Sequence, residues 1–227
     1  MRTRILPMLF LALAVFLHPL RAEEKGGAVK EPAKEPVKEP AKEPVKDETE
    51  REEVSPSPDG KFAFMASFSP EARSLDLIEK ATKKVLMRVA ESEEDSNRLS
   101  TKVLWAPDSR RFAISISTVF KRTSEVGVYT RSGATFRKTR IPKLPEAALP
   151  KGYASDPKRF WHTASLNWED PVCWRKDGSL VVEINTTVDG NDNTATALRT
   201  VVIGFGKNGA GKILDSSLKL TRHLEKD

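Results

Sequence analysis

The stretch SPDGKF at residues 57–62 decides the expected fold, because altered copies of it occur twice further along the chain. Residues 106–112 read APDSRRF and residues 175–180 read RKDGSL. Each copy keeps an Asp beside Pro, Gly or both. Pro presets φ within a tight turn and Gly suits the position that leaves it. A unit that occurs three times indicates a repeated architecture.

Apolar residues alternate with other residues behind each turn, which is the period of a β-strand. These residues are Phe62, Phe64 and Phe68 in the first unit, Phe112, Ile114 and Ile116 in the second, and Leu180, Val182 and Ile184 in the third. An aromatic residue stands three positions before the turn Asp in two units, as Trp105 and Trp174. The first unit has Pro56 there, which predicts a weak or missing leading strand.

Two further strands are expected downstream of each turn. The third strands are predicted at residues 75–78, 126–129 and 200–203, and the fourth strands at residues 85–89, 135–141 and 212–215. The sequence therefore predicts an all-β domain of three four-stranded antiparallel units.

This layout resembles the TolB-like, WD-repeat-like propeller repeats, whose units carry a W-S-P-D-G turn followed by an apolar strand. The resemblance covers roughly residues 54–216. The same repeat type forms the propeller of prolyl-oligopeptidase-like peptidases. The resemblance implies propeller-like sheets. Closed propellers have about four to eight blades, so about three units predict an incomplete propeller. The long connection, the segment from Ser217 or a second copy would then cover the open faces and edges.

Two segments precede the domain expected at residues 54–227. Residues 1–22 combine a basic start, an apolar run and Ala22 at a cleavage point, as in a secretory signal peptide. The apolar run is shorter than the roughly 20 residues that span a bilayer. Residues 23–53 form a linker in which Lys-Glu-Pro repeats at 30–45 exclude a helix. This linker is either a spacer or a passive tail. We expect a periplasmic or secreted protein with no membrane span after cleavage.

Residue types that carry catalysis and metal binding are sparse. His162 and His223 are the histidines beyond the signal, His223 is expected in a mobile tail, and no G-x-S-x-G elbow occurs. The single Cys173 cannot form an internal disulfide and is interpreted as a buried small hydrophobe. The stretch DGNDN at 189–193 has calcium-loop spacing, but Thr200 replaces the bidentate Glu, so a hairpin loop is preferred. We expect no enzyme, no cofactor and no metal.

Positive charge gathers in the middle of the domain. Residues 110–159 hold 12 basic and three acidic residues. The stretch FRKTRIPK at 136–143 supplies the candidate binding residues Arg137, Lys138, Arg140 and Lys143. Such a face attracts an acidic partner protein, an anionic glycan or lipid headgroups. Alternatively, these cations keep an edge strand soluble and bind nothing. Nucleic acid is not expected as a partner of an exported protein.

The sequence predicts an exported, non-catalytic binding or scaffolding module of the cell envelope. The alternative is a degenerate peptidase-type propeller that acts as an accessory to a separate exported hydrolase. A long connection at residues 142–168 separates the second and third units. Its aromatic residues either bind a ligand or cover the sheets, and they are Tyr153, Phe160, Trp161 and Trp168.

Overall fold

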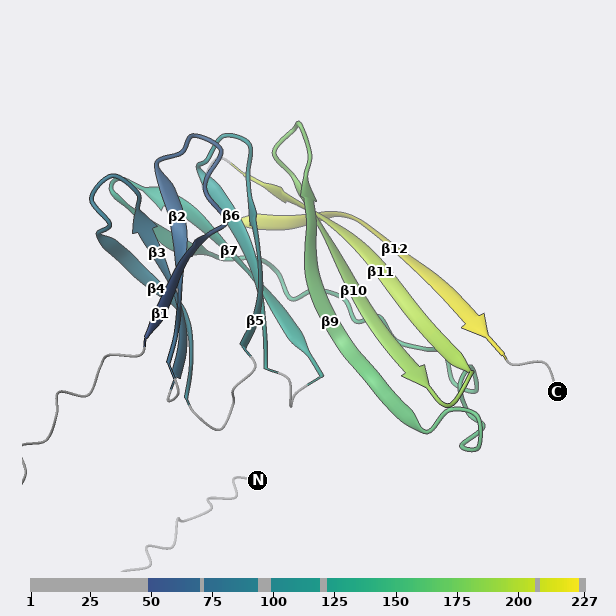
Figure 1. Ribbon diagram of the computed structural model, residues 1–227. Coiled ribbons are helices and arrows are strands. Elements are labelled where there is room, and N and C mark those ends of the chain that lie inside the picture. The colour runs from purple at the N-terminus through teal and green to yellow at the C-terminus, as the bar shows by residue number, and fades with distance from the viewer. Residues whose placement is uncertain (1–48, 70–71, 94–98, 119–121, 207–208, 225–227) are drawn as a thin grey trace, which may run out of the picture. The chain divides into compact units, whose positions relative to one another are not determined.

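The computed structural model describes residues 49–69, 72–93, 99–118, 122–206 and 209–224. Within these ranges every helix or strand element is a β-strand, so the all-β prediction is confirmed (Figure 1). The described residues contain no helix that could cross a membrane. The predicted signal peptide at 1–22 and the Lys-Glu-Pro repeats at 30–45 lie outside the described residues.

The strands form three successive antiparallel meanders of four strands each. The first comprises β1 (Glu50–Val54), β2 (Phe62–Phe68), β3 (Ala72–Glu79) and β4 (Val85–Glu93). The second comprises β5 (Leu99–Trp105), β6 (Arg111–Thr118), β7 (Ser124–Ser132) and β8 (Thr135–Thr139). The third comprises β9 (His162–Trp174), β10 (Leu180–Asp189), β11 (Thr194–Phe205) and β12 (Gly211–His223). The repeats in the sequence thus correspond to four-stranded units.

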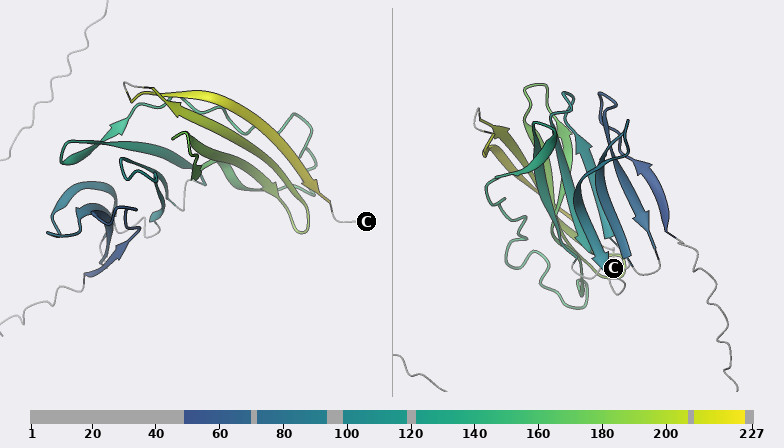
Figure 2. Two further views of the ribbon diagram at one scale, coloured as in Figure 1. Left: turned by 90° about the horizontal axis from the view of Figure 1, so that it is seen from above. Right: turned by 90° about the vertical axis from the view of Figure 1, so that its left-hand side faces the viewer.

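The first meander is a separate sheet, whereas the other two share one. The shared sheet has the order β12-β11-β10-β9-β7-β6-β5, and β8 pairs with β7 off this path, on the edge opposite β6. A single parallel pairing of Ser124 with Trp168 joins β7 to β9. Strands β9 to β12 curve as they run outward from this point (Figure 2). The second and third meanders are therefore joined at their edges as well as packed together.

Three predicted boundaries are corrected by the structure. The leading strand of the first unit is present, since β1 pairs with β2 and begins at Glu50, inside the predicted linker 23–53. Strand β9 begins at His162, inside the predicted connection 142–168. Strand β12 reaches His223, which pairs with Thr194 and is not in a mobile tail. Edge and bulged strands lack a clean apolar alternation, so the period of two did not reveal them.

The predicted apolar faces of the first two units pack against each other. Phe64 meets Phe112 edge to face at 5.1 Å between ring centroids, and Phe62 meets Phe136 at 5.2 Å. Trp105 lies among these rings, 5.2 Å from Phe112. Edge-to-face pairs stabilise a core beyond the area they bury. This aromatic cluster fixes the first meander on one face of the second.

The third meander covers the opposite face of the second. Leu180, Val182 and Ile184 are fully buried against Val126 and Val128 of β7. The connection between the meanders contributes Leu144 and Ala147 to the same cluster. Equivalent apolar faces meet at the first junction, but the third unit turns its apolar face to the reverse side of the second. The two junctions therefore differ, and one repeated rotation does not relate all three units.

The two repeat tryptophans tie each meander to the preceding one. The Trp105 Nε1–H donates to the Ser55 carbonyl at 2.8 Å, and the Trp174 Nε1–H donates to the Leu104 carbonyl at 3.0 Å. Ser55 and Leu104 hold the same position in their units, at the end of the leading strand. A partly buried indole N–H usually needs such a partner. The aromatic residue three positions before the turn Asp thus joins neighbouring units.

Cys173 is exposed, so its interpretation as a buried hydrophobe was wrong. A register shift in the β9–β10 pairing places Val181 opposite Cys173 and Val182 opposite Pro171. Pro171 is fully buried, whereas Cys173 lies opposite Val181 on the other side of the register shift and is exposed. The bulge therefore decides which side of the strand the thiol occupies.

Candidate functional site: a cationic groove

Two adjoining hollows at the second meander form a groove with a strong excess of positive charge. One, of about 350 Å³, is lined by Arg131, Arg137, Lys138 and Arg140 together with Thr130 and Gly209. The other, of about 270 Å³, shares Thr130 and Gly209 and adds further side chains, among them Arg110, Arg111 and Asp108. We call these two hollows the cationic groove. It takes cations from β6, β7, β8 and the turn before β6.

The four predicted binding residues are divided between two places. Arg137, Lys138 and Arg140 line the cationic groove and are exposed. Lys143 lines a different pocket, where its ammonium lies 4.0 Å from the Glu146 carboxylate and its side chain is 90% exposed. Three of the candidates are therefore brought together and the fourth is not.

Sequence reasoning about residues 136–143 missed half of the cations of the groove. Arg110 and Arg111 follow the turn of the second unit, and Arg131 ends its third strand. The Arg131 N–H donates to the Arg110 carbonyl at 2.8 Å, which holds these segments side by side. The signal was available, because the end of a third strand lies beside the turn into the second strand in each antiparallel meander.

Two of the arginines are held in place by aromatic rings. The Arg111 guanidinium lies 5.0 Å from the Trp174 ring centroid and 4.9 Å from that of Phe205. The Arg131 guanidinium lies 4.8 Å from the Phe62 ring centroid. Cation–π contacts leave the outward N–H groups of an arginine free to donate. These arginines are thus partly preorganised.

Gly178 makes room for the Arg111 guanidinium. A Cβ at this position would lie 2.9 Å from Arg111 Nη2, and the glycine has a φ of 78°. This φ is in the left-handed region that favours glycine. The DG dipeptide of the third turn therefore serves both the turn and the placement of an arginine from the second unit.

The remaining cations of the groove carry uncompensated charge. No carboxylate among the described residues forms an ion pair with Arg137, Lys138 or Arg140. The one carboxylate of the groove, Asp108, accepts the Arg110 backbone N–H at 2.9 Å. Exposed, unpaired cations on adjacent strands produce a positive potential that an anion can neutralise.

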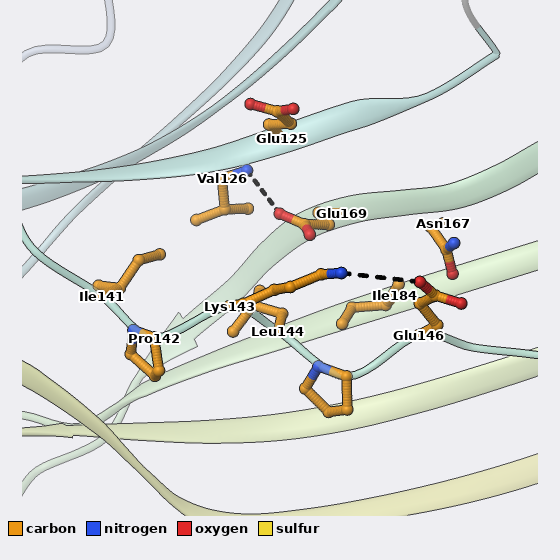
Figure 3. A pocket seen from close by; sticks show the side chains of 11 residues that line it. Glu125, Val126, Ile141, Pro142, Lys143, Leu144, Glu146, Asn167, Glu169 and Ile184 are labelled. Carbon is orange, nitrogen blue, oxygen red and sulfur yellow. Dashed lines mark hydrogen bonds and ion pairs between the residues drawn. The ribbon is translucent and has the colours of Figure 1, made fainter. Parts of the chain in front are cut away.

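The pocket that contains Lys143 is built around a half-buried carboxyl group (Figure 3). Glu169 accepts the Val126 N–H at 2.8 Å, and its own carbonyl accepts the Ser115 and Ser124 hydroxyls. Burial raises the pKa of Glu169; the Val126 N–H opposes this and nearby Glu125 adds to it. This carboxyl ties the third meander to the second, so we assign it a structural role.

The aromatic residues of the connection divide between cover and surface. Phe160 is buried, and the Arg222 guanidinium lies 5.4 Å from its ring centroid and 5.7 Å from that of Tyr153. Trp161 is 65% exposed. Trp168 belongs to β9 and not to the connection. Of the two interpretations of these aromatic residues, covering the sheets therefore applies to part of the connection.

The DGNDN stretch forms a hairpin loop between β10 and β11. The Gly190 N–H donates to the Asn193 carbonyl at 3.0 Å, so the hairpin interpretation is confirmed. A Cβ on Gly190 would lie 2.0 Å from the Arg159 carbonyl oxygen, which requires glycine there. Among the described residues, no three His, Cys, Asp or Glu side chains are grouped to hold a metal ion.

Comparison with known proteins leaves the family open. No family model matches the sequence, and no curated protein matches it. A crystal structure of an uncharacterized protein from Listeria monocytogenes EGD-e is similar over 74% of this chain, with 13% identity and a TM-score of 0.30. The match covers 52% of that protein, so this chain spans about half of its length.

Proposed function

We propose that the chain is an exported, non-catalytic binding module whose cationic groove takes an anionic glycan or an acidic partner protein. The observation that carries the proposal is that two adjoining hollows are lined by six cations, Arg110, Arg111, Arg131, Arg137, Lys138 and Arg140. The signal-like sequence of residues 1–22 and the Lys-Glu-Pro repeats at 30–45 support an envelope location. The three turns and four-stranded meanders support a degenerate, propeller-like origin of the TolB-like type.

The chemistry of the groove favours carboxylate or sulfate groups in an extended chain. Five of the six cations are arginines, and a guanidinium donates two parallel N–H bonds to one oxyanion. Because the cations are distributed over two connected hollows, a polymer with regularly spaced anions can neutralise several of them together. Counterion release then makes the affinity fall as salt concentration rises.

A competing explanation is that the cations of β8 protect the edge of the sheet and bind no ligand. This strand pairs only with β7 among the described strands, so Arg137 and Lys138 lie on an edge strand. Cations on an edge protect it from pairing with other chains. That role does not account for Arg110 and Arg111, which belong to β6 and its turn and still line the same groove.

The test compares retention on a heparin column for the parent chain and for two variants that each lose three positive charges. The triple variant Arg137→Gln, Lys138→Gln, Arg140→Gln should elute at clearly lower salt than the parent chain. The control Lys84→Gln, Lys151→Gln, Lys158→Gln removes as much charge from exposed positions outside the groove and should elute close to the parent.

Three results would count against the proposal. Equal elution of the groove variant and the parent would exclude β8 as the anion site. An equal shift in the control variant would indicate net charge and not the groove. Aggregation of the groove variant without loss of retention would favour the edge-protection role. Lys143→Gln alone should change retention little, because Lys143 lies in the other pocket.

A further inference from the structure

The last strand of the domain presents an open edge beyond its first residue, Gly211, whose N–H donates to the Arg140 carbonyl at 2.9 Å. Strand β12 ends the shared sheet, and β11 is its one neighbouring strand among the described residues. Apart from Gly211 and Leu220, every residue of Gly211–His223 is exposed. Figures 1 and 2 show β12, in yellow, as the outermost strand of the third meander. An open edge of this length is a template for pairing with another strand.

At the centre of β12 the hydrogen bonds show which backbone N–H and C=O groups point away from β11. The Ser216 N–H donates to the Asp215 carboxylate at 2.8 Å and so is directed away from β11. In an antiparallel ladder every second residue turns both backbone groups to the same side, so Leu218 also faces outward. Ser216 and Leu218 therefore offer the donors and acceptors that an incoming strand would use.

We propose that two copies of this chain associate by antiparallel pairing of their β12 edges, centred on Ser217. In this register Ser217 lies opposite the Ser217 of the second copy. Asp215 then lies opposite Lys219 of the second copy, and Lys219 opposite its Asp215. Opposite charges directly across an antiparallel pair are stabilising. The outward residue Ser216 lies opposite Leu218, which completes the backbone pairing.

This register also places the Asp215 and Lys219 side chains on the same face of the sheet. Asp215 pairs with Val202 and Lys219 with Leu198 in β11, and both of these side chains lie on the same face. The two charged residues therefore also share a face across the proposed pair. Because a two-fold pair is isologous, the complementary contact occurs twice. On pairing, the Asp215 carboxylate exchanges the Ser216 N–H for the ammonium of the second copy.

Neighbouring registers lack this complementarity. Because only every second residue of β12 turns its backbone groups outward, the nearest alternative registers are shifted by two residues, and they place Asp215 opposite Ser217 or Thr221. These alignments leave Asp215 without an opposite charge, so the charges of β12 favour the register centred on Ser217. The bulge between Val202 and Ile203 makes Leu214 the extra residue of β12 and ends the regular pairing on that side. The paired stretch is thus short, and we expect a weak dimer that forms with increasing concentration.

Charge reversal tests the register directly. Sedimentation equilibrium of the purified chain should show a monomer–dimer equilibrium. Asp215→Lys or Lys219→Asp alone should weaken association, because each places like charges opposite one another. The double variant Asp215→Lys, Lys219→Asp restores opposite charges and should restore association. A parent chain that stays monomeric at the highest concentration it tolerates would overturn the proposal. So would a double variant that stays as weak as the single ones.

A cysteine placed at the symmetry centre gives a second readout. In a Cys173→Ser background, Ser217→Cys should form an intermolecular disulfide on mild oxidation, since facing residues of an antiparallel pair lie within disulfide distance. The matched variant Ser100→Cys, on the distant edge strand β5, should cross-link far less. Equal cross-linking of the two variants would overturn the register. A monomer whose edge instead accepts a strand of another protein would also overturn it.

Discussion

Trp105 links the first two meanders through both its ring and its N–H group, and the two contributions can be separated by substitution. Trp105→Phe keeps an aromatic ring but removes the donor to the Ser55 carbonyl. A lost hydrogen bond of this kind costs about 1 kcal/mol. Trp105→Ala also removes the contacts with Phe62, Phe64, Phe112 and Phe136. Truncation of a large aromatic residue in a core costs about 3–5 kcal/mol, and the half-buried Trp105 belongs at the lower end.

Urea denaturation measures both losses. The midpoint should fall modestly for Trp105→Phe and about three times as far for Trp105→Ala, while the dependence of the unfolding free energy on urea stays constant. Trp161→Phe is the control, because Trp161 is 65% exposed and should leave the midpoint unchanged. The reasoning would be refuted if the Phe and Ala variants were equally destabilised, or if neither differed from the parent.

One substitution and one chemical modification test two further features of the fold. Because the pKa of Glu169 is raised by burial, this group's contribution to stability is present below its unfolded pKa and is lost as pH rises through its folded pKa. The melting temperature of the parent should therefore rise between neutral and mildly acidic pH, and that of the Glu169→Gln variant should lack this rise. An identical pH dependence of the melting temperature in the two proteins would contradict the buried state of this carboxyl. Cys173 is exposed, so a thiol reagent should modify it fully in the folded protein, and it should be protected only if a partner covers this face. Modification that requires denaturant would contradict the placement of the bulge in β9.

The regular parts of the fold could be predicted from the sequence because their signals are local. Alternation behind each turn identified the buried faces of β2, β6 and β10, and the aromatic position before two turns marked β5 and β9. The leading strand β1 was missed because its charged side chains are exposed on an edge, where burial imposes no pattern. The bulge in β9 was missed because it depends on how two strands pair, and it reversed the expected environment of Cys173.

The candidate site was predictable only in part, for a related reason. Arg137, Lys138 and Arg140 are close in sequence and remain together in the groove. Lys143 follows Pro142, where the chain leaves β8, and so it enters a different pocket. Arg110 and Arg111 reach the groove through the meander topology. Proximity in space between segments that are distant in sequence cannot be read from composition.

The salt dependence of polyanion affinity tests the central claim most directly. The dissociation constant for a heparin oligosaccharide is measured at several salt concentrations, for the parent chain and for the variant with Gln at positions 137, 138 and 140. If these cations bind the anion, the slope of log affinity against log salt should become shallower by about one for each contact removed. The affinity at low salt should also fall. An unchanged slope and an unchanged affinity in the triple variant would contradict the assignment of the cationic groove as the binding site.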